Sequence, residues 1–268
     1  MSPLRRGWLL TAAAFLLLLT PGQGWAEREH FQLKIGASYD EGDFGTSTTS
    51  RTLFLPVTFR YLGDRFDIGV TGSFVHFETG GGVALLDGVA TRTEGAQGAR
   101  ETENGIGDTV FKGRIYLLDD PGPASPVPAL TPFVKIKVPT ADEEKNLGTG
   151  ETDYGFGLEF DKRLGSFFLF GDVSYTVIGD PPGQDLRNRP AASFGAGAEL
   201  SKAISVSGLI DWRRSLVSGT DDPIELVGIV SVRPTRTITV SPYIFVGLTD
   251  GSPDEGVGVE LSYKFGRY

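Results

Sequence analysis

Two pairs of basic residues stand two positions apart in the sequence, Lys112 with Arg114 and Lys135 with Lys137. Successive side chains of a β-strand point to opposite faces, so this spacing places both members of a pair on the same face. Cations gathered on one face could form a positive patch that selects ions in a pore. Lys135 and Lys137 are the best candidates for such a patch, provided that the chain around them is a strand.

Catalytic chemistry finds little support in the sequence. His30 and His76 are the two histidines, and neither lies in a Ser- or Asp-containing motif that would pair a nucleophile with a base. The stretch Gly105-Ile106-Gly107-Asp108 lacks the following helix that a dinucleotide site requires. Short acidic stretches occur at 142–144, 221–222 and 254–255. They are more typical of solvated loops than of a metal site. We therefore predict no enzyme, no catalytic residue, no cofactor and no metal site.

The chain around the basic pairs alternates apolar with polar or small residues at period two, which is typical of strands. The last nine residues of this pattern, 257–265, read VGVELSYKF. About twelve such strands are predicted, with 10–14 as the range. They cover 31–39, 53–61, 66–74, 109–117, 130–138, 154–160, 167–175, 194–200, 204–212, 224–232, 240–248 and 257–265.

The connections between these strands alternate between short turns and long loops. The long loops are acidic and rich in Gly, Asp, Thr and Pro, and they cover 40–50, 78–104, 140–151, 179–190, 215–222 and 249–255. Strands of about ten residues suffice to cross an outer membrane when they are tilted. The sequence therefore predicts an all-β, antiparallel transmembrane β-barrel with short periplasmic turns and long extracellular loops. A soluble β-sandwich is the alternative, but it would not need charged residues on the second face of so many strands.

Residues 1–26 are predicted to be a cleaved signal peptide. Arg5 and Arg6 precede an apolar run at 8–19, which is too short to span a membrane as a helix. Small residues at Gly24 and Ala26 fit a cleavage site. Residues 27–268 then form a single barrel domain, which we expect in the outer membrane of a Gram-negative bacterium.

The strand face opposite the apolar one would line the lumen. The charged and aromatic candidates for a pore lining are Arg60, Asp108, Lys112, Arg114, Tyr116, Phe133, Lys135, Lys137, Glu159, Asp172, Asp211, Arg213, Arg233 and Tyr243. Charges of both signs could instead pair across the wall and stiffen the barrel. Further apolar positions with the same parity are Phe54, Val75, Phe77, Val110, Phe168, Phe170, Leu209, Val227, Ile229 and Phe245. These positions fit either a route for an apolar solute or a plugged lumen.

The partners expected of such a barrel follow from its surface and its charge. Its apolar face would contact outer-membrane lipid and lipopolysaccharide, and a small hydrophobic solute could enter the lumen. Nucleic acid is not an expected partner, because 34 acidic residues outnumber 25 basic ones. Phe265 and Tyr268 are candidates for the aromatic signal that the barrel-assembly machinery recognises, with Phe265 also in the aromatic belt.

Three short motifs in fixed order resemble the "meta-pathway of phenol degradation" family of outer-membrane transporters. They are Gly105-Ile106-Gly107-Asp108, then Lys135-Ile136-Lys137-Val138-Pro139-Thr140, then Asp153-Tyr154-Gly155-Phe156-Gly157. The resemblance runs from about residue 100 to the C-terminus. Ala141 departs from the family pattern, which continues Pro-Thr with Gly. The resemblance implies uptake of aromatic or other hydrophobic compounds across the outer membrane.

Two functional hypotheses follow from the sequence. The chain is either a narrow passive channel for small hydrophobic or aromatic compounds, or a closed structural barrel that acts through its extracellular loops, notably 78–104. Twelve strands favour a narrow or gated pore, because eight strands leave a filled interior and sixteen or more leave an open one.

Overall fold

The expected strands are present in the computed structural model, which describes residues 30–80, 82–86, 89–92, 101–142, 145 and 147–266. The strands of these residues are β1 (Phe31–Gly42), β2 (Ser50–Leu62), β3 (Phe66–Thr79), β4 (Val83–Leu86), β5 (Val89–Arg92), β6 (Glu101–Ile106), β7 (Thr109–Ile115), β8 (Ala129–Val138), β9 (Asp153–Leu164), β10 (Phe167–Val177), β11 (Arg189–Glu199), β12 (Ile204–Arg213), β13 (Ile224–Val232), β14 (Ile238–Gly247) and β15 (Glu255–Phe265). None of these residues belongs to a helix long and apolar enough to cross a membrane. The predicted signal peptide lies outside the described residues.

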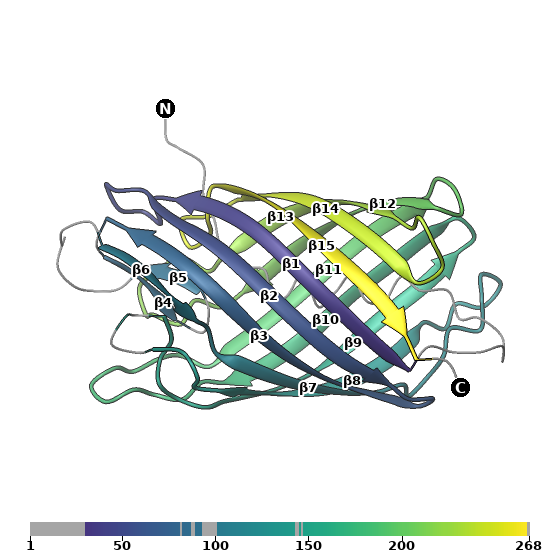
Figure 1. Cartoon of the computed structure of the whole chain (residues 1–268), viewed down its shortest axis with the longest axis horizontal. Helices are drawn as coiled ribbons and strands as arrows, with labels where there is room; N and C mark the ends of the chain where they lie inside the picture. Colours follow the sequence, from purple (N-terminus) through teal and green to yellow (C-terminus); the bar gives the residue numbers. More distant parts are fainter. Residues whose placement is uncertain are drawn as a thin grey trace.

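Most of these strands join into one antiparallel sheet that closes on itself (Figure 1). The sheet has thirteen strands among the described residues, and β6 and β7 pair with successive parts of β3. Because β6 and β7 share one position in the wall, the described chain forms a twelve-stranded barrel. The predicted fold class is confirmed.

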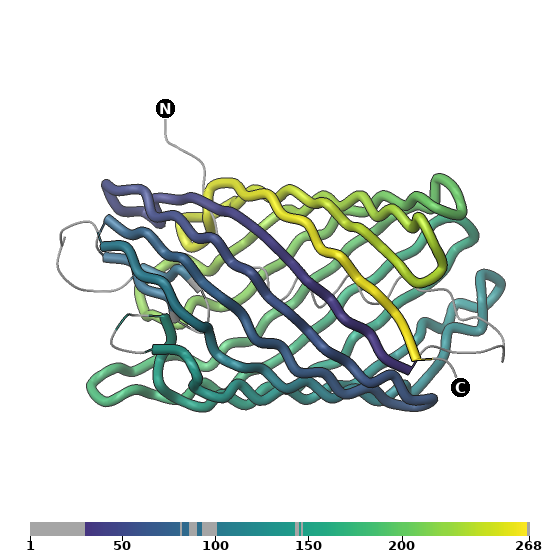
Figure 2. Tube along the Cα trace, viewed as in Figure 1, coloured from purple at the N-terminus to yellow at the C-terminus, as the bar shows by residue number. Residues whose placement is uncertain are grey.

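The barrel is closed by its first and last strands, which lie side by side (Figure 2). β1 pairs with β15 from Phe31 opposite Phe265 to Glu41 opposite Glu255. The other side of β1 pairs with β2. Closure therefore leaves no unpaired edge at this seam, as the predicted barrel requires.

Residues 78–104 were expected to be one long loop, and that expectation is wrong in part. β3 continues to Thr79, β4 and β5 form a hairpin of their own, and β6 returns to the wall at Glu101. Gly107 and Asp108 then interrupt the strand between β6 and β7. A Cβ atom at Gly107 would lie 2.3 Å from Oγ of Ser73, so glycine allows the backbone to pass close to β3 here.

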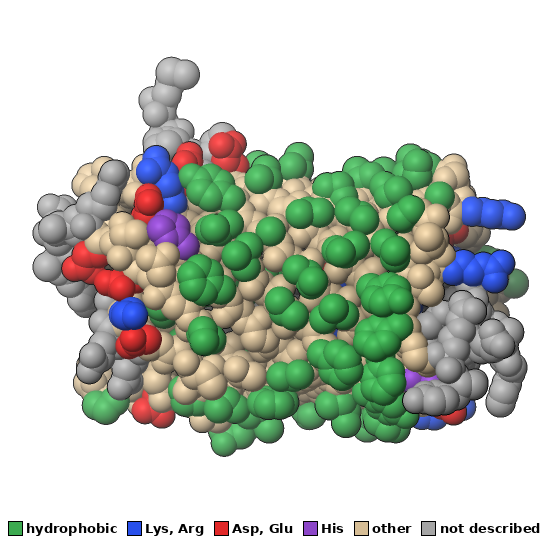
Figure 3. All heavy atoms as spheres, in the orientation of Figure 1, with side chains coloured by type: hydrophobic (Ala, Val, Ile, Leu, Met, Phe, Trp, Pro, Cys, Tyr) green, Lys and Arg blue, Asp and Glu red, His purple; other side chains and the backbone are tan. Residues whose placement is uncertain are grey.

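Apolar side chains cover the outside of the barrel. At alternate strand positions they are exposed, among them Ile35, Val57, Ile68, Val134, Phe156, Val173, Phe194, Ile210, Leu226, Ile244 and Val257. Figure 3 shows them spread over the middle of the molecule, with most of the charged side chains of this face near its two ends. An apolar surface of this extent suits contact with lipid acyl chains.

Aromatic rings gather on the outside of the seam at the end with the short turns. The ring of Phe31 stacks on Phe265 and on Phe59, with 5.7 Å between centroids in both cases. Phe265 also stacks on Tyr263 at 5.5 Å. Phe265 therefore ties β15 to β1 and β2 in addition to its expected place in the aromatic belt, whereas Tyr268 lies outside the described residues.

Replacing Phe265 with alanine should lower the free energy of unfolding by about 2 kcal/mol, because it removes three ring contacts at the seam. Val257→Ala is the matched control, since Val257 faces outward on the same strand and has no aromatic ring. Denaturant unfolding in lipid vesicles measures the difference. A separate deletion of residues 266–268 should lower assembly in cells, and unchanged assembly would contradict the role given to Tyr268.

Candidate functional site in the barrel lumen

The predicted lumen residues share the inward face of the wall. Those that the barrel buries are Arg60, Arg114, Phe133, Lys137, Glu159, Asp172, Asp211, Arg213 and Tyr243. Those that remain partly exposed are Asp108, Lys112, Tyr116, Lys135 and Arg233. Asp108, Tyr116 and Arg233 lie just outside the strands, and the contacts among all these side chains depend on the register between strands.

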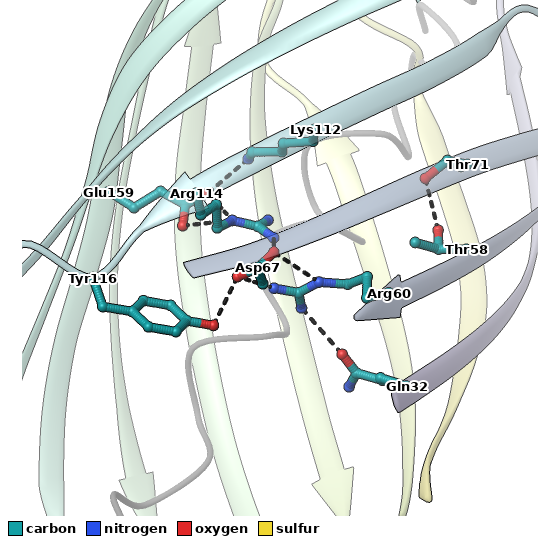
Figure 4. Close-up of polar contacts among 9 residues, drawn as sticks. All are labelled: Gln32, Thr58, Arg60, Asp67, Thr71, Lys112, Arg114, Tyr116 and Glu159. Carbon is teal, nitrogen blue, oxygen red and sulfur yellow. Dashed lines mark hydrogen bonds and ion pairs between the residues drawn. The ribbon is translucent and has the colours of Figure 1, made fainter. Parts of the chain in front are cut away.

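A cluster of charged residues spans the wall near the end with the short turns. We call Arg60, Asp67, Lys112, Arg114 and Glu159 the charge cluster (Figure 4). Arg114 is central, because its Nη1 lies 3.1 Å from Oδ1 of Asp67 and its Nε lies 3.0 Å from Oε2 of Glu159. Arg60 Nη2 reaches Asp67 at 2.6 Å, and Lys112 Nζ reaches Glu159 at 2.6 Å. The cluster therefore links β2, β3, β7 and β9 across the strand β8.

Neutral side chains complete the charge cluster around Asp67, Arg60 and Lys112. The hydroxyl of Tyr116 donates to Oδ2 of Asp67 at 2.8 Å, and Arg60 Nη1 donates to Oε1 of Gln32 at 3.1 Å. Lys112 also lies over the ring of Phe133, with Nζ 3.8 Å from its centroid. The charges of the cluster thus compensate one another along the wall, which fits the predicted stiffening role.

Two further groups of charges pair nearer the end with the long loops. Arg213 forms ion pairs with Asp211 and with Glu225, all on β12 and β13. Lys137 Nζ lies 2.7 Å from Oδ2 of Asp153 and 3.3 Å from Oδ2 of Asp108. Two carboxylates therefore compensate the charge of Lys137, which argues against the positive patch that the spacing of Lys135 and Lys137 suggested.

The three motifs that carry the family resemblance meet around Lys137. Asp108 comes from the first motif, Lys137 from the second and Asp153 from the third. Oδ1 of Asp108 also accepts hydrogen bonds from the backbone N–H groups of Thr140 and Ala141, both at 3.1 Å. The motifs thus fasten the start of the loop after β8 to the barrel wall, and Ala141 does not prevent this contact.

A buried charged contact outside the barrel lumen lies in the proline-rich turn between β7 and β8. Asp120 accepts hydrogen bonds from Nζ of Lys162 and from the backbone N–H of Arg163, the latter at 2.8 Å. Partial burial disfavours the charged form of Asp120, but these hydrogen bonds outweigh it and hold the pKa of Asp120 below its usual value. The turn thereby covers Lys162, which is buried although it has the parity of the lipid face.

The apolar lumen residues form one packed cluster that crosses many strands. We call this the apolar band, and its members are Phe54, Val75, Phe77, Phe168, Phe170, Leu209, Val227, Ile229, Tyr243 and Phe245. The register joins them directly: Leu209 stands opposite Val227, and Val227 stands opposite Phe245. All of these residues were predicted to face the lumen.

The apolar band rises along the barrel from one end to the other. Phe168 is the second residue of β10, directly after a short turn, whereas Phe77 lies near the end of β3 that leads into the long segment 78–104. Tyr243 and Phe245 occupy the middle of β14 between them. Because the strands tilt, a set of residues that follows the register across the sheet also climbs along the barrel axis. The band therefore reaches from the periplasmic side of the lumen to the extracellular side.

Loop residues close over the extracellular end of the apolar band. Phe44, Leu147 and, from the β4–β5 hairpin, Val83, Leu85 and Ala90 pack in the same cluster and are buried. Phe44 has a left-handed backbone (φ 49°), which costs energy for a non-glycine residue, and the turn is held by a hydrogen bond from Gly45 N to Oδ1 of Asp43 at 2.8 Å. The sequence did not identify these residues, because no periodic pattern marks a loop side chain that turns inward.

Comparisons with known proteins agree with this geometry at the level of the fold. No model of a known protein family matches the chain, and no curated protein matches its sequence. Among solved structures, an outer membrane channel from Pseudomonas putida F1 is 12% identical with a TM-score of 0.65, over 92% of this chain and 100% of that one. The NanC porin is 11% identical with a TM-score of 0.56, over 87% and 100%.

A third similar structure is the translocator domain of the autotransporter NalP from Neisseria meningitidis. It is 10% identical with a TM-score of 0.54, over 96% of this chain and 95% of that one. Identities this low establish a shared fold, while the specific family that the motifs resemble stays a hypothesis. The chain has the fold of an outer-membrane β-barrel.

Proposed function

We propose that the chain is a narrow outer-membrane channel for small hydrophobic or aromatic compounds. The observation that carries this proposal is the apolar band, which extends along the lumen from the extracellular loops to the periplasmic end. An apolar solute is held by apolar and aromatic walls with few polar contacts. A continuous band offers such a wall at every depth of the membrane.

The charges of the lumen support the same proposal. Arg114, Lys137 and Arg213 each form ion pairs with two carboxylates. Charges that are paired within the wall exert a weak field on the lumen, so they provide little attraction for a free ion. The structures with a similar fold include an outer membrane channel and a porin, and the family that the motifs resemble implies uptake of aromatic compounds.

The test combines electrical recording with solute uptake. The purified barrel in a planar bilayer should give steady, small opening steps, as a narrow pore predicts. Phenylnaphthylamine is an uncharged aromatic compound. Cells with an intact lipopolysaccharide leaflet should take it up faster when their outer membrane contains the barrel than when it does not. A silent bilayer together with unchanged uptake would refute the channel.

A polar substitution in the apolar band should slow uptake without closing the pore. Val227→Thr keeps the side-chain shape and adds a hydroxyl to the band, and it should lower phenylnaphthylamine uptake by about fivefold, since placing a hydroxyl against an apolar group costs on the order of 1 kcal/mol. Val230→Thr on the same strand is the control, because Val230 faces outward. Equal uptake by the two variants would show that the band is not the route.

A closed barrel that acts through its loops is the second candidate. The burial of Phe44, Val83, Leu85 and Leu147 at the extracellular end of the band favours it, because these side chains would block a static pore. Opening would then require the loops to move, and the bilayer recording decides between the two candidates.

We further propose that the protein resides in the outer membrane of a Gram-negative bacterium, after export through a cleaved signal peptide. Lipid, lipopolysaccharide and the barrel-assembly machinery are its proposed partners, and nucleic acid and enzymatic turnover have no part in the proposal. Sequencing the N-terminus of the mature protein tests the cleavage, which should fall before Glu27.

A further inference from the structure

Five inward-facing aromatic residues each stand directly opposite a glycine of the neighbouring strand. The pairs are Phe133 with Gly157, Phe168 with Gly197, Phe170 with Gly195, Tyr243 with Gly258, and Phe245 with Gly256. The rings and the glycines come from different strands, so the pairing arises from the register and not from any local motif.

Each ring occupies the space that a side chain at its glycine would need. A Cβ atom at Gly256 would lie 2.2 Å from Cζ of Phe245, and one at Gly258 would lie 2.3 Å from Cζ of Tyr243. The corresponding distance from Gly197 to Cζ of Phe168 is 2.2 Å. Carbon atoms pack at about 3.5–4.0 Å, so no other residue leaves room for the ring. The rings therefore lie along the wall, over the glycines, and do not project toward the barrel axis.

Two glycines on the outer face of the wall, Gly72 and Gly228, have no such neighbours, whereas the outward Gly171 lies under the ring of Phe160. A Cβ atom at Gly72 would meet nothing within 4 Å, and one at Gly228 would meet only Cγ1 of Ile244 at 3.8 Å. Gly72 and Gly228 therefore serve as references for glycines without a ring above them, and five of the overlaps between a ring and a glycine lie on the lumen face.

We infer that these inward-facing glycines set the bore of the lumen and thereby determine which solutes pass. By accepting a ring against the wall, each glycine lets a buried aromatic side chain take up less of the lumen than a ring that projects toward the axis. This inference rests on the proposed channel function and identifies the residues that determine its size selectivity. A methyl group added at such a glycine must displace the ring above it. For the ring of Phe245 over Gly256, the wall on the other side is occupied by Val227. The displaced ring of Phe245 then turns into the lumen.

Gly256 and Gly258 on β15 are the cleanest positions for a test. The three atoms nearest to a Cβ at Gly256 all belong to the ring of Phe245, and those at Gly258 all belong to Tyr243. At Gly195 and Gly197 the added methyl group would also meet Gly208 O at 2.9 Å and Ser207 Cβ at 2.7 Å. Substitution there would therefore disturb the wall as well as the ring.

The experiment compares Gly256→Ala and Gly258→Ala with Gly228→Ala in planar bilayers. The two lumen variants should lose conductance by about twofold or more, because the ring narrows the pore, while Gly228→Ala should match the wild type. The double variant Gly256→Ala with Phe245→Leu should recover the conductance, because it removes the displaced ring. This rescue separates a change of bore from a failure to fold.

A second measurement does not depend on conduction. In the wild-type barrel in detergent micelles, the Hα protons of Gly256 and Gly258 should resonate upfield of those of Gly72 and Gly228, because only the former lie beneath an aromatic ring. Normal shifts at Gly256 and Gly258 would overturn the inference. So would a conducting wild type whose two alanine variants behave like Gly228→Ala. A silent wild type would instead overturn the channel function, while the resonances still decide where the rings lie.

Discussion

Replacing Arg114 with alanine should lower the free energy of unfolding of the barrel by about 3 kcal/mol, the cost of breaking a buried ion pair. Arg114 is 4% exposed, and its guanidinium contacts Asp67 and Glu159, which are 0% and 4% exposed. Without Arg114, Asp67 keeps Arg60 and Glu159 keeps Lys112, so the loss is expected at the lower end for buried charges. Denaturant unfolding in lipid vesicles, followed by tryptophan fluorescence, measures the change.

Arg65→Ala is the matched control for the loss of Arg114. Arg65 pairs with Asp119 at 3.5 Å, but the two side chains are 72% and 79% exposed, and such pairs contribute little because water screens them. A loss of stability for Arg114→Ala no larger than that for Arg65→Ala would show that the charge cluster does not hold β2, β3, β7 and β9 together.

The second large effect concerns the outer surface. Ile244→Arg should destabilise the barrel by about 2–4 kcal/mol, since it places a charge on the lipid face near the middle of the membrane. Ile244 lies within β14 and is 63% exposed, so the substitution introduces no steric overlap inside the wall. Equilibrium unfolding in phospholipid vesicles reports the cost directly.

Leu200→Arg provides the comparison for depth. Leu200 is 65% exposed, almost the same as Ile244, but it lies in the short turn between β11 and β12, at the edge of the membrane. Arginine there should cost about 0–1 kcal/mol, because the cation reaches water and lipid headgroups. Equal costs at the two positions would mean that the outer face of β14 is not in contact with lipid.

Loop side chains pack against the extracellular end of the apolar band, which bears on the proposed channel. Phe44, Leu85 and Leu147 approach the apolar band from three different loops. Arg92 joins two of these loops by donating from Nη1 to the carbonyl oxygen of Gly45 at 3.3 Å. Any opening of the lumen would have to displace these side chains together, which explains why loop motion and conduction should be linked.

The alternation of apolar and polar residues was sufficient to predict the twelve-stranded barrel and the face of each strand. The period of two is a local property, because successive side chains of a strand point to opposite faces whichever strand is its neighbour. For this reason Tyr243 and Glu159 could be placed in the lumen, and Ile244 on the outside, from their positions alone. The pairing of the last strand with the first also followed, since a barrel has to close, but the register of that pairing did not.

Only the tertiary structure decided which side chains contact one another in the lumen. Arg114 reaches Glu159 across β8, Phe245 lies over Gly256 of the next strand, and Leu85 turns inward from a segment expected to be a surface loop. Each contact joins residues that are far apart along the chain. Their meeting depends on strand register and on loop packing, which are set by the summed contacts of many residues and leave no signal in a short stretch of sequence.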